Sequence, residues 1–472
     1  MKRTSIHLLI LLCACQCSFA QVDHYWSQQF GAVSTLSGGA MVAGIRDNSA
    51  AFYNPGGLAY VEFPNLSVDA NIYKMDQLKI TNGAGSGVNL NSAQMSIYPQ
   101  ILAGMLSFIK TPGLKLSWTI LTRNFNNVLL STRYTRETEA QANGSTDAFL
   151  GELDYVDQMN EQWFGLCASY KLNDHLGVGI TLFGVYRGET SSLMNKSREK
   201  TGTDSSSVLV IMNNSEKMKY NVFRALIKAG LAYEIKRWRL GLTVTTPSLG
   251  LYGNGSARRE LSSNSLATGN PGGKNPYLIV AEDQSVKATF YHPLSIGFGI
   301  EYKSSKTRIA VSGEYFFKIS PYKIMASSIE PFIYPPSVKD SAAVKSEMDH
   351  FLLYGNGARS VFNIGVGFDQ SVGKGFSVLI GAHTDFSSYT SSPDSRVMNH
   401  GTGVWDLYYV SAGVSYRRTR NVVTVGFIYG FTPSKSVEPI AVVTPGETPQ
   451  FKTNAFAQSF GVVLGYTYFF PK

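Results

Sequence analysis

The sequence has few charged residues, little cysteine and no long apolar run. Charged residues make up 16% of the chain, below the roughly one quarter that is usual in soluble domains. Three of the four cysteines lie in the first twenty residues, so removal of that segment would leave Cys167 alone and exclude an intrachain disulfide. After that segment, no apolar run reaches the roughly 20 residues that a membrane-spanning helix needs. Aromatic residues are plentiful, at 12%. This balance is typical of a transmembrane β-barrel, with a large secreted β-sandwich as the alternative.

The first twenty residues have the pattern of an export signal. Lys2 and Arg3 are basic, Ile6–Ala14 is apolar, and Ser18-Phe19-Ala20 is a small-x-small cleavage site. We therefore expect a signal peptide over 1–20 and a mature chain of 472 − 20 = 452 residues. An alternative is lipoprotein processing at Cys15, because Leu12-Cys13-Ala14-Cys15 loosely resembles a lipidation box.

Large apolar side chains recur at every second position in many later segments. One such set is Leu294, Ile296, Phe298, Ile300 and Tyr302, which alternates with Ser295, Gly297, Gly299, Glu301 and Lys303. An apolar face opposite a small or polar face fits a strand between lipid and an aqueous lumen. A soluble sandwich would alternate as well, but its outward face would carry more charge.

Fourteen segments of this kind predict fourteen strands. They span 64–78, 93–110, 114–137, 155–173, 175–192, 217–236, 237–252, 285–304, 305–323, 358–373, 374–391, 402–419, 421–437 and 452–470. Their connections alternate between short turns and long loops, and the long ones lie near 79–92, 138–154, 193–216, 253–284, 324–357, 392–401 and 438–451. Short periplasmic turns with long outer loops are typical of outer-membrane barrels. The even count places both termini of the barrel on the periplasmic side, and we expect the barrel over 64–472.

The last strand also carries a pattern of its own. Val463-x-Gly465-x-x-Tyr468-x-Phe470 resembles the terminal-strand signal that the bacterial barrel-assembly machinery reads, although Pro471 and Lys472 follow the final aromatic residue. An ordinary amphipathic strand explains the same residues. The barrel-assembly machinery is therefore an expected partner during biogenesis, together with outer-membrane lipid.

The alternation is lost between Gln21 and Phe63, where glycine is frequent. Asp47-Asn48-Ser49 is able to cap a short helix, and Asn54-Pro55-Gly56-Gly57 is a stop and turn signal. A fourteen-stranded barrel is wider than its own side chains fill, so we expect residues 21–63 to plug the lumen as a hatch. The expected gating residues are Asp47, Asn48, Phe52, Asn54, Pro55, Gly56 and Gly57. The alternative is a generic turn.

Two motifs in this segment resemble the FadL family of outer-membrane transporters for long-chain fatty acids and other hydrophobic compounds such as toluene. They are Gly38-Gly39-Ala40 with Ala43-Gly44, and Asp47-Asn48-Ser49-Ala50-Ala51-Phe52-Tyr53-Asn54-Pro55-Gly56-Gly57-Leu58. The family typically has Asn-Pro-Ala in its hatch, and this chain has Gly56 where that alanine stands. The strand count and length extend the likeness over the whole mature chain.

The resemblance implies a route for a ligand. It would first meet an apolar groove between the third and fourth outer loops, then move to a site inside the barrel, and leave through hatch rearrangement and a kinked strand. The candidate groove residues are Val208, Val210, Ile211, Leu261, Leu266, Leu278 and Val280; exposed apolar runs mark binding surfaces, although loop-on-loop packing is an alternative. Pro99 and Pro293 lie inside predicted strands and are the candidate kinks, unless either stands at a strand end.

The sequence offers little for catalysis, metal binding or nucleic-acid binding. No two histidines have metal-site spacing, so we expect no metal and no cofactor, and the excess positive charge forms no basic block that would bind nucleic acid. His383 and Asp385 share a strand face and suggest a third, weaker hypothesis of a lipid hydrolase.

The sequence thus predicts a passive transporter of hydrophobic small molecules in the outer membrane of a Gram-negative bacterium, not an enzyme. The alternative is a structural or surface-interaction barrel that acts through its long outer loops. The ligand, the oligomeric state and the direction of release, sideways or into the periplasm, stay open.

Overall fold

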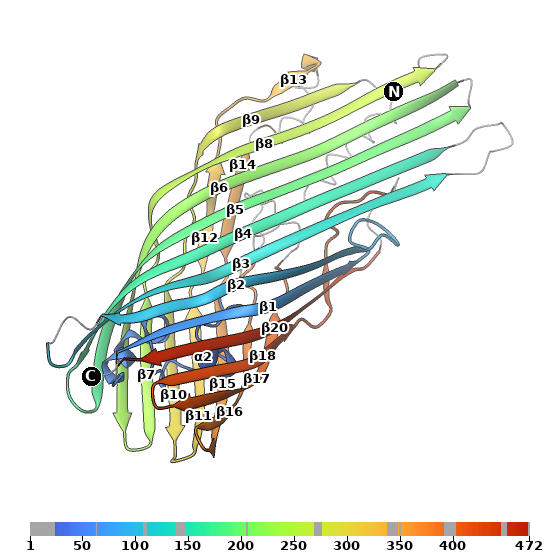
Figure 1. The fold of residues 1–472 in the computed structure, drawn as a ribbon. Helices are drawn as coiled ribbons and strands as arrows, with labels where there is room; N and C mark the ends of the chain where they lie inside the picture. The colour runs from blue at the N-terminus through green and yellow to red at the C-terminus, as the bar shows by residue number, and fades with distance from the viewer. Residues whose placement is uncertain are drawn as a thin grey trace.

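The computed structural model describes residues 24–62, 64–106, 111–137, 147–203, 206–268, 276–337, 348, 351–390, 403–444 and 451–470. The expected signal peptide over 1–20 and Cys15 lie outside these residues. Fourteen antiparallel strands form a barrel that closes where the last strand pairs with the first (Figure 1). In order around the barrel, the strands are β1 (Asn65–Thr81), β2 (Leu90–Leu106), β3 (Leu114–Glu137), β4 (Ala148–Lys171), β5 (Leu176–Thr203), β6 (Ser206–Ile235), β7 (Trp238–Thr245), β10 (Ser295–Lys303), β11 (Thr307–Phe316), β15 (Val361–Gly373), β16 (Phe376–Asp385), β17 (Leu407–Arg418), β18 (Asn421–Phe431) and β20 (Thr453–Phe469).

Each of the fourteen predicted strands corresponds to one of these, so the predicted fold class is confirmed. The short connections lie at one end of the barrel, where the C-terminal end of β20 is also found (Figure 1). Lys236 and Lys374, in two of these turns, adopt positive φ values of 54° and 53°, as two-residue hairpins require. Loop length therefore distinguishes the two ends of the barrel.

The outer surface carries an apolar belt. On β10, Ile296, Phe298 and Ile300 are 36%, 49% and 43% exposed, while Ser295 and Glu301, at the alternate positions on either side of them, are buried in the lumen. Such a belt suits a barrel wall in contact with lipid. No helix in the described part of the chain is long and apolar enough to cross a membrane.

One side of the barrel is much taller than the other. Strands β3 to β6 have 24 to 30 residues, whereas β7, β10 and β11 have 8 to 10. Above β7, the wall continues as β8 (Leu249–Thr268), which pairs with β6, then β9 (Tyr277–Lys287) and β13 (Phe332–Tyr334). A separate pair, β12 (Ile319–Ala326) and β14 (Leu353–Ala358), packs against this extension, and β19 (Lys435–Val437) pairs with β20.

The expected long loops over 193–216 and 253–284 are therefore wrong in part, since β5, β6, β8 and β9 run through them. These segments lie beyond the lipid belt, where neither face of the sheet must be apolar. Backbone pairing does not depend on side-chain polarity, so the strands continue where the alternation of apolar and polar residues has ended.

The N-terminal residues form a hatch inside the barrel. Its short elements are α2 (Ala32–Leu36), α3 (Ala50–Tyr53) and the 3₁₀ turn η1 (Pro55–Tyr60), and nearly all of its side chains are buried. Phe30, Phe52 and Leu58 pack with Trp163 and Phe183 of the wall in one apolar cluster. The hatch is thus a part of the barrel core.

The apolar belt predicts a position-dependent cost for charge. Val425 lies in the middle of β18 and is 46% exposed, so Val425→Arg should lower the free energy of unfolding in lipid vesicles by roughly 2–4 kcal/mol. Val372 is 62% exposed but lies beside the turn at Gly373, and Val372→Arg should cost about 0–1 kcal/mol. Denaturant titrations of both variants measure the difference. Equal losses would contradict this placement of the belt.

Candidate functional site

Two buried asparagines fasten the hatch to the wall. The Asn54 side-chain amide donates to the carbonyl oxygens of Val42 (2.7 Å) and Leu231 (2.8 Å), while its oxygen accepts from the N–H of Gly56 (3.0 Å). The Asn48 amide donates to the carbonyl oxygens of Asn65 (3.1 Å) and Ala103 (3.0 Å). Both asparagines are 0% exposed. The sequence-predicted residues Asn48 and Asn54 therefore join the hatch to β2 and β6.

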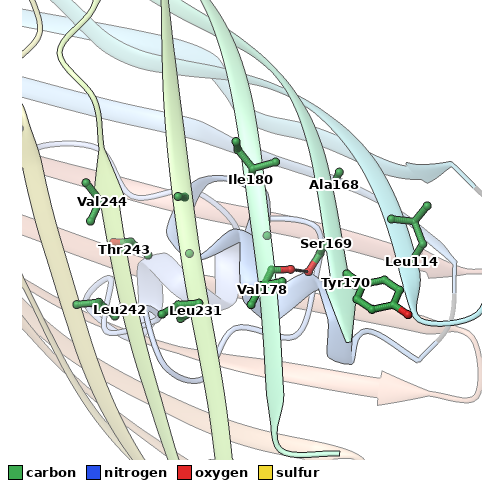
Figure 2. A pocket seen from close by; sticks show the side chains of 13 residues that line it. Leu114, Ala168, Ser169, Tyr170, Val178, Ile180, Leu231, Leu242, Thr243 and Val244 are labelled. Atoms are coloured by element: carbon green, nitrogen blue, oxygen red, sulfur yellow. Dashed lines mark hydrogen bonds between the residues drawn. The ribbon is translucent and has the colours of Figure 1, made fainter. Parts of the chain in front are cut away.

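Glycines let the hatch turn touch the backbone of the wall. A Cβ atom at Gly56 would lie 2.8 Å from the carbonyl oxygens of Gly177 and Gly230, and a Cβ at Gly179 would collide with the backbone of Pro55. Gly177 and Gly179 lie on β5 and Gly230 on β6, and Figure 2 shows these two strands with the hatch directly behind them. Gly56 therefore replaces the alanine of the family motif at a position where a methyl group has no room.

The remaining predicted hatch residues act within the hatch or against aromatic rings. Asp47 accepts from the N–H of Ser49 (2.8 Å); Pro55 begins η1, and Gly57 packs on Ile45. The Phe52 ring meets Phe30 edge to face at 4.5 Å between centroids, and the Lys228 ammonium lies 4.9 Å from its centre.

A half-buried ion pair and a buried hydroxyl also contact the hatch. At its periplasmic side, Arg46 forms an ion pair with Glu234 and lies over the Tyr60 ring at 4.8 Å; burial holds the pKa of Arg46 below its usual value, with Arg239 adding repulsion. Inside the hatch, burial raises the pKa of the Tyr53 hydroxyl, which donates to Gln29 Oε1 at 2.9 Å and accepts from the N–H of Phe30 at 2.9 Å.

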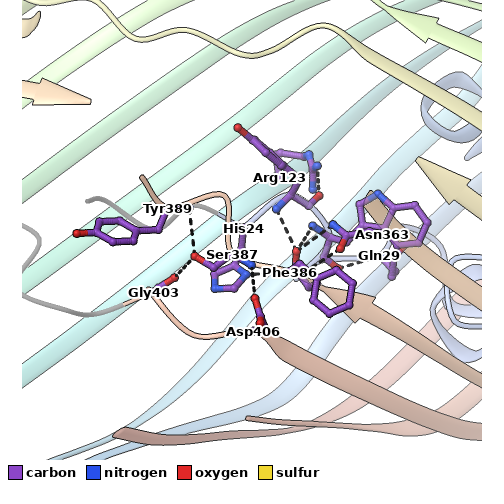
Figure 3. Close-up of polar contacts among 12 residues, drawn as sticks. His24, Gln29, Arg123, Asn363, Phe386, Ser387, Tyr389, Gly403 and Asp406 are labelled. Carbon is purple, nitrogen blue, oxygen red and sulfur yellow. Dashed lines mark hydrogen bonds and ion pairs between the residues drawn. The ribbon is translucent and has the colours of Figure 1, made fainter. Parts of the chain in front are cut away.

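A polar junction holds the start of the hatch at the outer end of β16 (Figure 3). Asp385 accepts from the backbone N–H groups of Tyr25 (3.2 Å) and Trp26 (2.9 Å), and His24 lies 3.2 Å from its other oxygen. His383 instead stacks on Tyr409, with ring centroids 4.6 Å apart. The Asp385 carboxylate thus anchors the hatch. Because His383 stacks on Tyr409 instead of pairing with Asp385, this geometry does not support the hydrolase hypothesis.

The backbone ladder of the wall is interrupted beside the hatch. Pairing between β2 and β3 stops at Ile101–Leu121. Beyond this pair, Leu90–Pro99 pairs with β1 and Thr122–Glu137 pairs with β4, but not with each other. We call this stretch the β2–β3 seam. In hydrocarbon an unpaired edge is costly, so a seam that reaches the lipid belt is a candidate opening.

Side chains bridge the seam in place of backbone pairs. The bridges are Asn127 Nδ2 to Gln94 Oε1 at 3.3 Å, the Leu129 N–H to Ser92 Oγ at 3.3 Å, and the stacked rings of Tyr98 and Phe125 at 5.2 Å between centroids. Met95 and Ile97 on the lipid side of β2 are 64% and 69% exposed. The lower part of the seam therefore borders lipid outside and aromatic rings inside.

A bulge on each strand marks the lower end of the seam. Asp69 pairs with Ile101 and Ala70 with Pro99, which leaves Gln100 as the extra residue of β2. Pro99 has no N–H to donate, so its position at the break fits the expected kink. Pro293 instead lies in the irregular segment before β10, so the expectation of a kink within a strand is wrong there.

Arg123 is the bulge residue of β3 and reaches into the hatch. The ladder with β4 shifts between Thr122 and Asn124, and the Arg123 side chain is buried. Its Nη2 donates to the carbonyl oxygen of Tyr25, and the guanidinium lies 5.4 Å from the Phe52 ring centre. Two of its nitrogens, Nε and Nη1, have no hydrogen-bond partner among the residues that the structure describes. Arg123 therefore connects the seam to the hatch.

The seven expected groove residues do not form one surface. They lie on β6, β8 and β9, where cross-strand pairing places Val208, Val210 and Leu261 on the inner face, and Ile211, Leu266, Leu278 and Val280 on the opposite face. Leu261 packs with Ile279, Met325 and Phe351. β12, β14 and the adjoining Phe351 and Leu352 thus cover the inner apolar face, as the packing alternative expects.

The lumen around the hatch is tightly filled. Three cavities that border it have volumes of about 20, 20 and 10 Å³, which is room for about one water molecule each. Within the described ranges, no cluster of three or more histidine, cysteine or acidic side chains is arranged to hold a metal ion. Each of these three cavities is too small for a ligand larger than water.

Sequence reasoning missed Arg123, Tyr98, Phe125 and the Gln94–Asn127 bridge. Bulges leave little trace in one sequence, because they shift the alternation by a single residue. The sequence does contain one indication of the bulge: in the run Thr122-Arg123-Asn124, a basic residue interrupts the alternation of apolar and polar residues along the strand.

The fold matches known outer-membrane channels. No family model and no curated protein matches the chain. Among solved structures, a Pseudomonas aeruginosa FadL homologue is 11% identical with a TM-score of 0.56, covering 96% of this chain and 100% of that one. The Pseudomonas putida toluene transporter TodX (11%, 0.55, 95% and 100%) and the Ralstonia pickettii toluene transporter TbuX (12%, 0.56, 94% and 99%) are similar to the same extent. The fold expected from the FadL-like motifs is thus confirmed.

Because the hatch turn lies directly against the backbone of the wall, one methyl group added at Gly56 should disturb it. Gly56→Ala should loosen the hatch, because the added Cβ meets wall backbone at 2.8 Å. We expect higher leakage of small polar solutes from vesicles that contain the variant. Gly250→Ala is the matched control, because a Cβ at that strand glycine meets nothing within 4 Å. Unchanged leakage in Gly56→Ala would contradict a sealing role for this contact.

Proposed function

We propose that this protein carries hydrophobic small molecules, such as long-chain fatty acids or aromatic hydrocarbons, passively across the outer membrane through a hatch-gated barrel. The observation that supports it most is the β2–β3 seam, an interrupted ladder that lies beside the hatch and borders the lipid belt. The fold it shares with a FadL homologue and two toluene transporters supports the same function.

The route has two covered ends. At the outer end, β12, β14 and the adjoining Phe351 pack on the inner face of the tall wall, so a ligand must displace residues such as Met325 and Phe351. Farther in, the ligand reaches the hatch, and Arg123 connects that hatch to the bulge of β3. Movement of the hatch would release Arg123 and free the Tyr98–Phe125 stack, which opens the seam towards lipid. Apolar transfer of about 25 cal/mol per Å² drives such passage without covalent chemistry.

The lumen favours a ligand with a hydrogen-bond acceptor. Nε and Nη1 of Arg123, which have no partner in the described part of the chain, lie in a buried position between the hatch and the seam. A carboxylate would satisfy these donors, and hydrogen bonds to charged groups contribute roughly 1.5–3 kcal/mol. We therefore assign fatty acids as the first ligand class and plain hydrocarbons as the second. Export by residues 1–20, a hatch over 21–63 and barrel assembly in the outer membrane complete this proposal.

Closing the seam covalently should stop transport. In a Cys167→Ser background, the pair Gln94→Cys and Asn127→Cys places thiols where the two side chains now bridge the seam at 3.3 Å. A short, reducible thiol crosslinker should lower uptake of a radiolabelled fatty acid into vesicles to the level of protein-free vesicles, and reductant should restore it.

The pair Leu102→Cys and Ile120→Cys is the matched control, because these residues already face each other in the paired part of the ladder. Crosslinking there should leave uptake unchanged. Full uptake with the crosslinked seam would rule out the sideways route.

Arg123→Gln separates the two ligand classes. Glutamine keeps an amide donor for the Tyr25 carbonyl but loses the charge, so fatty-acid uptake should fall about tenfold from the loss of a charge-assisted bond. Toluene uptake should stay within about twofold, since no polar bond is lost. Competition assays with both labelled ligands measure the ratio. Equal losses would show that Arg123 serves the hatch and not the ligand.

A further inference from the structure

The lipid-facing side of the wall has an apolar hollow directly behind the hatch turn. Its volume is about 650 Å³, and thirteen residues of β3 to β7 line it (Figure 2). Ile180, Leu231 and Leu242 at its surface are 49%, 44% and 44% exposed. Its size falls within the roughly 300–1,000 Å³ of small-molecule sites.

Small residues on the outer face create the hollow. Ala168, Ile180, Ala229 and Val244 are directly paired across β4, β5, β6 and β7, so two alanines interrupt a row that is otherwise large and apolar. The rows on either side carry Leu166, Leu182 and Ile227, and Tyr170, Leu231 and Leu242.

Glycines complete the hollow from the other side of the wall. Gly179 and Gly230 belong to its floor, and their missing side chains are where Pro55 and Asn54 of the hatch turn lie. A single layer of backbone therefore separates the hollow from the hatch. The same glycines that seat the hatch leave this part of the wall thin.

The lining selects an apolar occupant. None of the thirteen lining residues is charged. The hydroxyl of Ser169 donates to the carbonyl oxygen of Val178 at 2.9 Å, and that of Thr243 to the carbonyl oxygen of Gly297 at 3.5 Å. These two hydroxyls thus have a backbone acceptor, and apart from the Tyr170 hydroxyl the lining offers burial rather than polar recognition.

Two basic residues, Lys236 and Arg237, lie at the membrane edge on the periplasmic side of the hollow. Leu231 and Leu242 face each other and lie five residues from Lys236 and Arg237 of the β6–β7 turn. At roughly 3.3 Å per residue this separation is about 16 Å, close to half of the roughly 30 Å hydrocarbon thickness. Both cations are exposed, so they lie where a phosphate head group would be when its acyl chain reaches the hollow.

We propose that this hollow binds one acyl chain of a phospholipid from the periplasmic leaflet, with Lys236 and Arg237 beside its phosphate. The site lies outside the ligand route and does not depend on the transport function. It places a membrane lipid against the outer side of the hatch seat.

Photo-crosslinking tests the site in the full-length protein. The probe is phosphatidylglycerol with a diazirine in the middle of one acyl chain, mixed into phospholipid vesicles. In the native protein, crosslinks should concentrate on peptides that contain Ile180, Ala229–Leu231 and Leu242–Val244. Ala229→Phe fills the hollow and should lower these crosslinks about tenfold, the change expected when about two methylene groups lose their burial.

Ala225→Phe is the matched control, because Ala225 shares the outer face of β6 but lies outside the hollow; its crosslinks should match the native level. If Ala229→Phe fails to fold, Ala168→Phe fills the hollow from β4 and should give the same loss. Lys236→Glu with Arg237→Glu should also lower the crosslinks. Labels spread evenly around the belt, or unchanged by filling the hollow, would overturn the proposal.

Discussion

The ladder of backbone hydrogen bonds around the barrel governs the rest of this structure. Hydrocarbon provides no partner for an N–H or C=O group, so a sheet in a membrane must close, as β1 and β20 close this one. Against this requirement, the missing pairs above Ile101–Leu121 stand out. Bulges at Gln100 and Arg123 accompany the break on both strands, and side chains take over the contacts. An interruption of this kind at the lipid belt, next to the hatch, is the physical basis of the transport proposal.

The hatch is held by many small contacts and not by one large interface. Asn48 and Asn54 join it to wall carbonyls, Asp385 binds its first described residues, and Arg46 pairs with Glu234. Each neutral hydrogen bond contributes about 1 kcal/mol, so several must break together before the hatch moves. In the proposed transport, a ligand would release the hatch by replacing some of these contacts. The glycine contacts between Gly56 and the wall set how closely the hatch is seated.

The sequence was sufficient to predict the fourteen strands and the hatch, because lipid imposes strict alternation on the wall, and glycine, asparagine and proline mark the turn at Asn54–Gly57. It was not sufficient beyond the lipid belt, where the strands β8 and β9 lack that alternation and Leu261 and Leu278 fall on opposite faces. Pro99 was chosen as a candidate kink because proline is conspicuous in a strand, and it lies beside the bulge at Gln100. Arg123, Tyr98 and Phe125 were missed, since their roles arise only when β2 separates from β3 beside the hatch.

Labelling the path of a ligand tests the central claim most directly. A long-chain fatty acid with a photoreactive group can be activated during uptake into vesicles that contain the protein, and the labelled residues identified by mass spectrometry. The account predicts labels on both sides of the β2–β3 seam, at Tyr98 and Phe125. Labels confined to the periplasmic edge of the hatch, around Arg46 and Glu234, would contradict a sideways route through the wall.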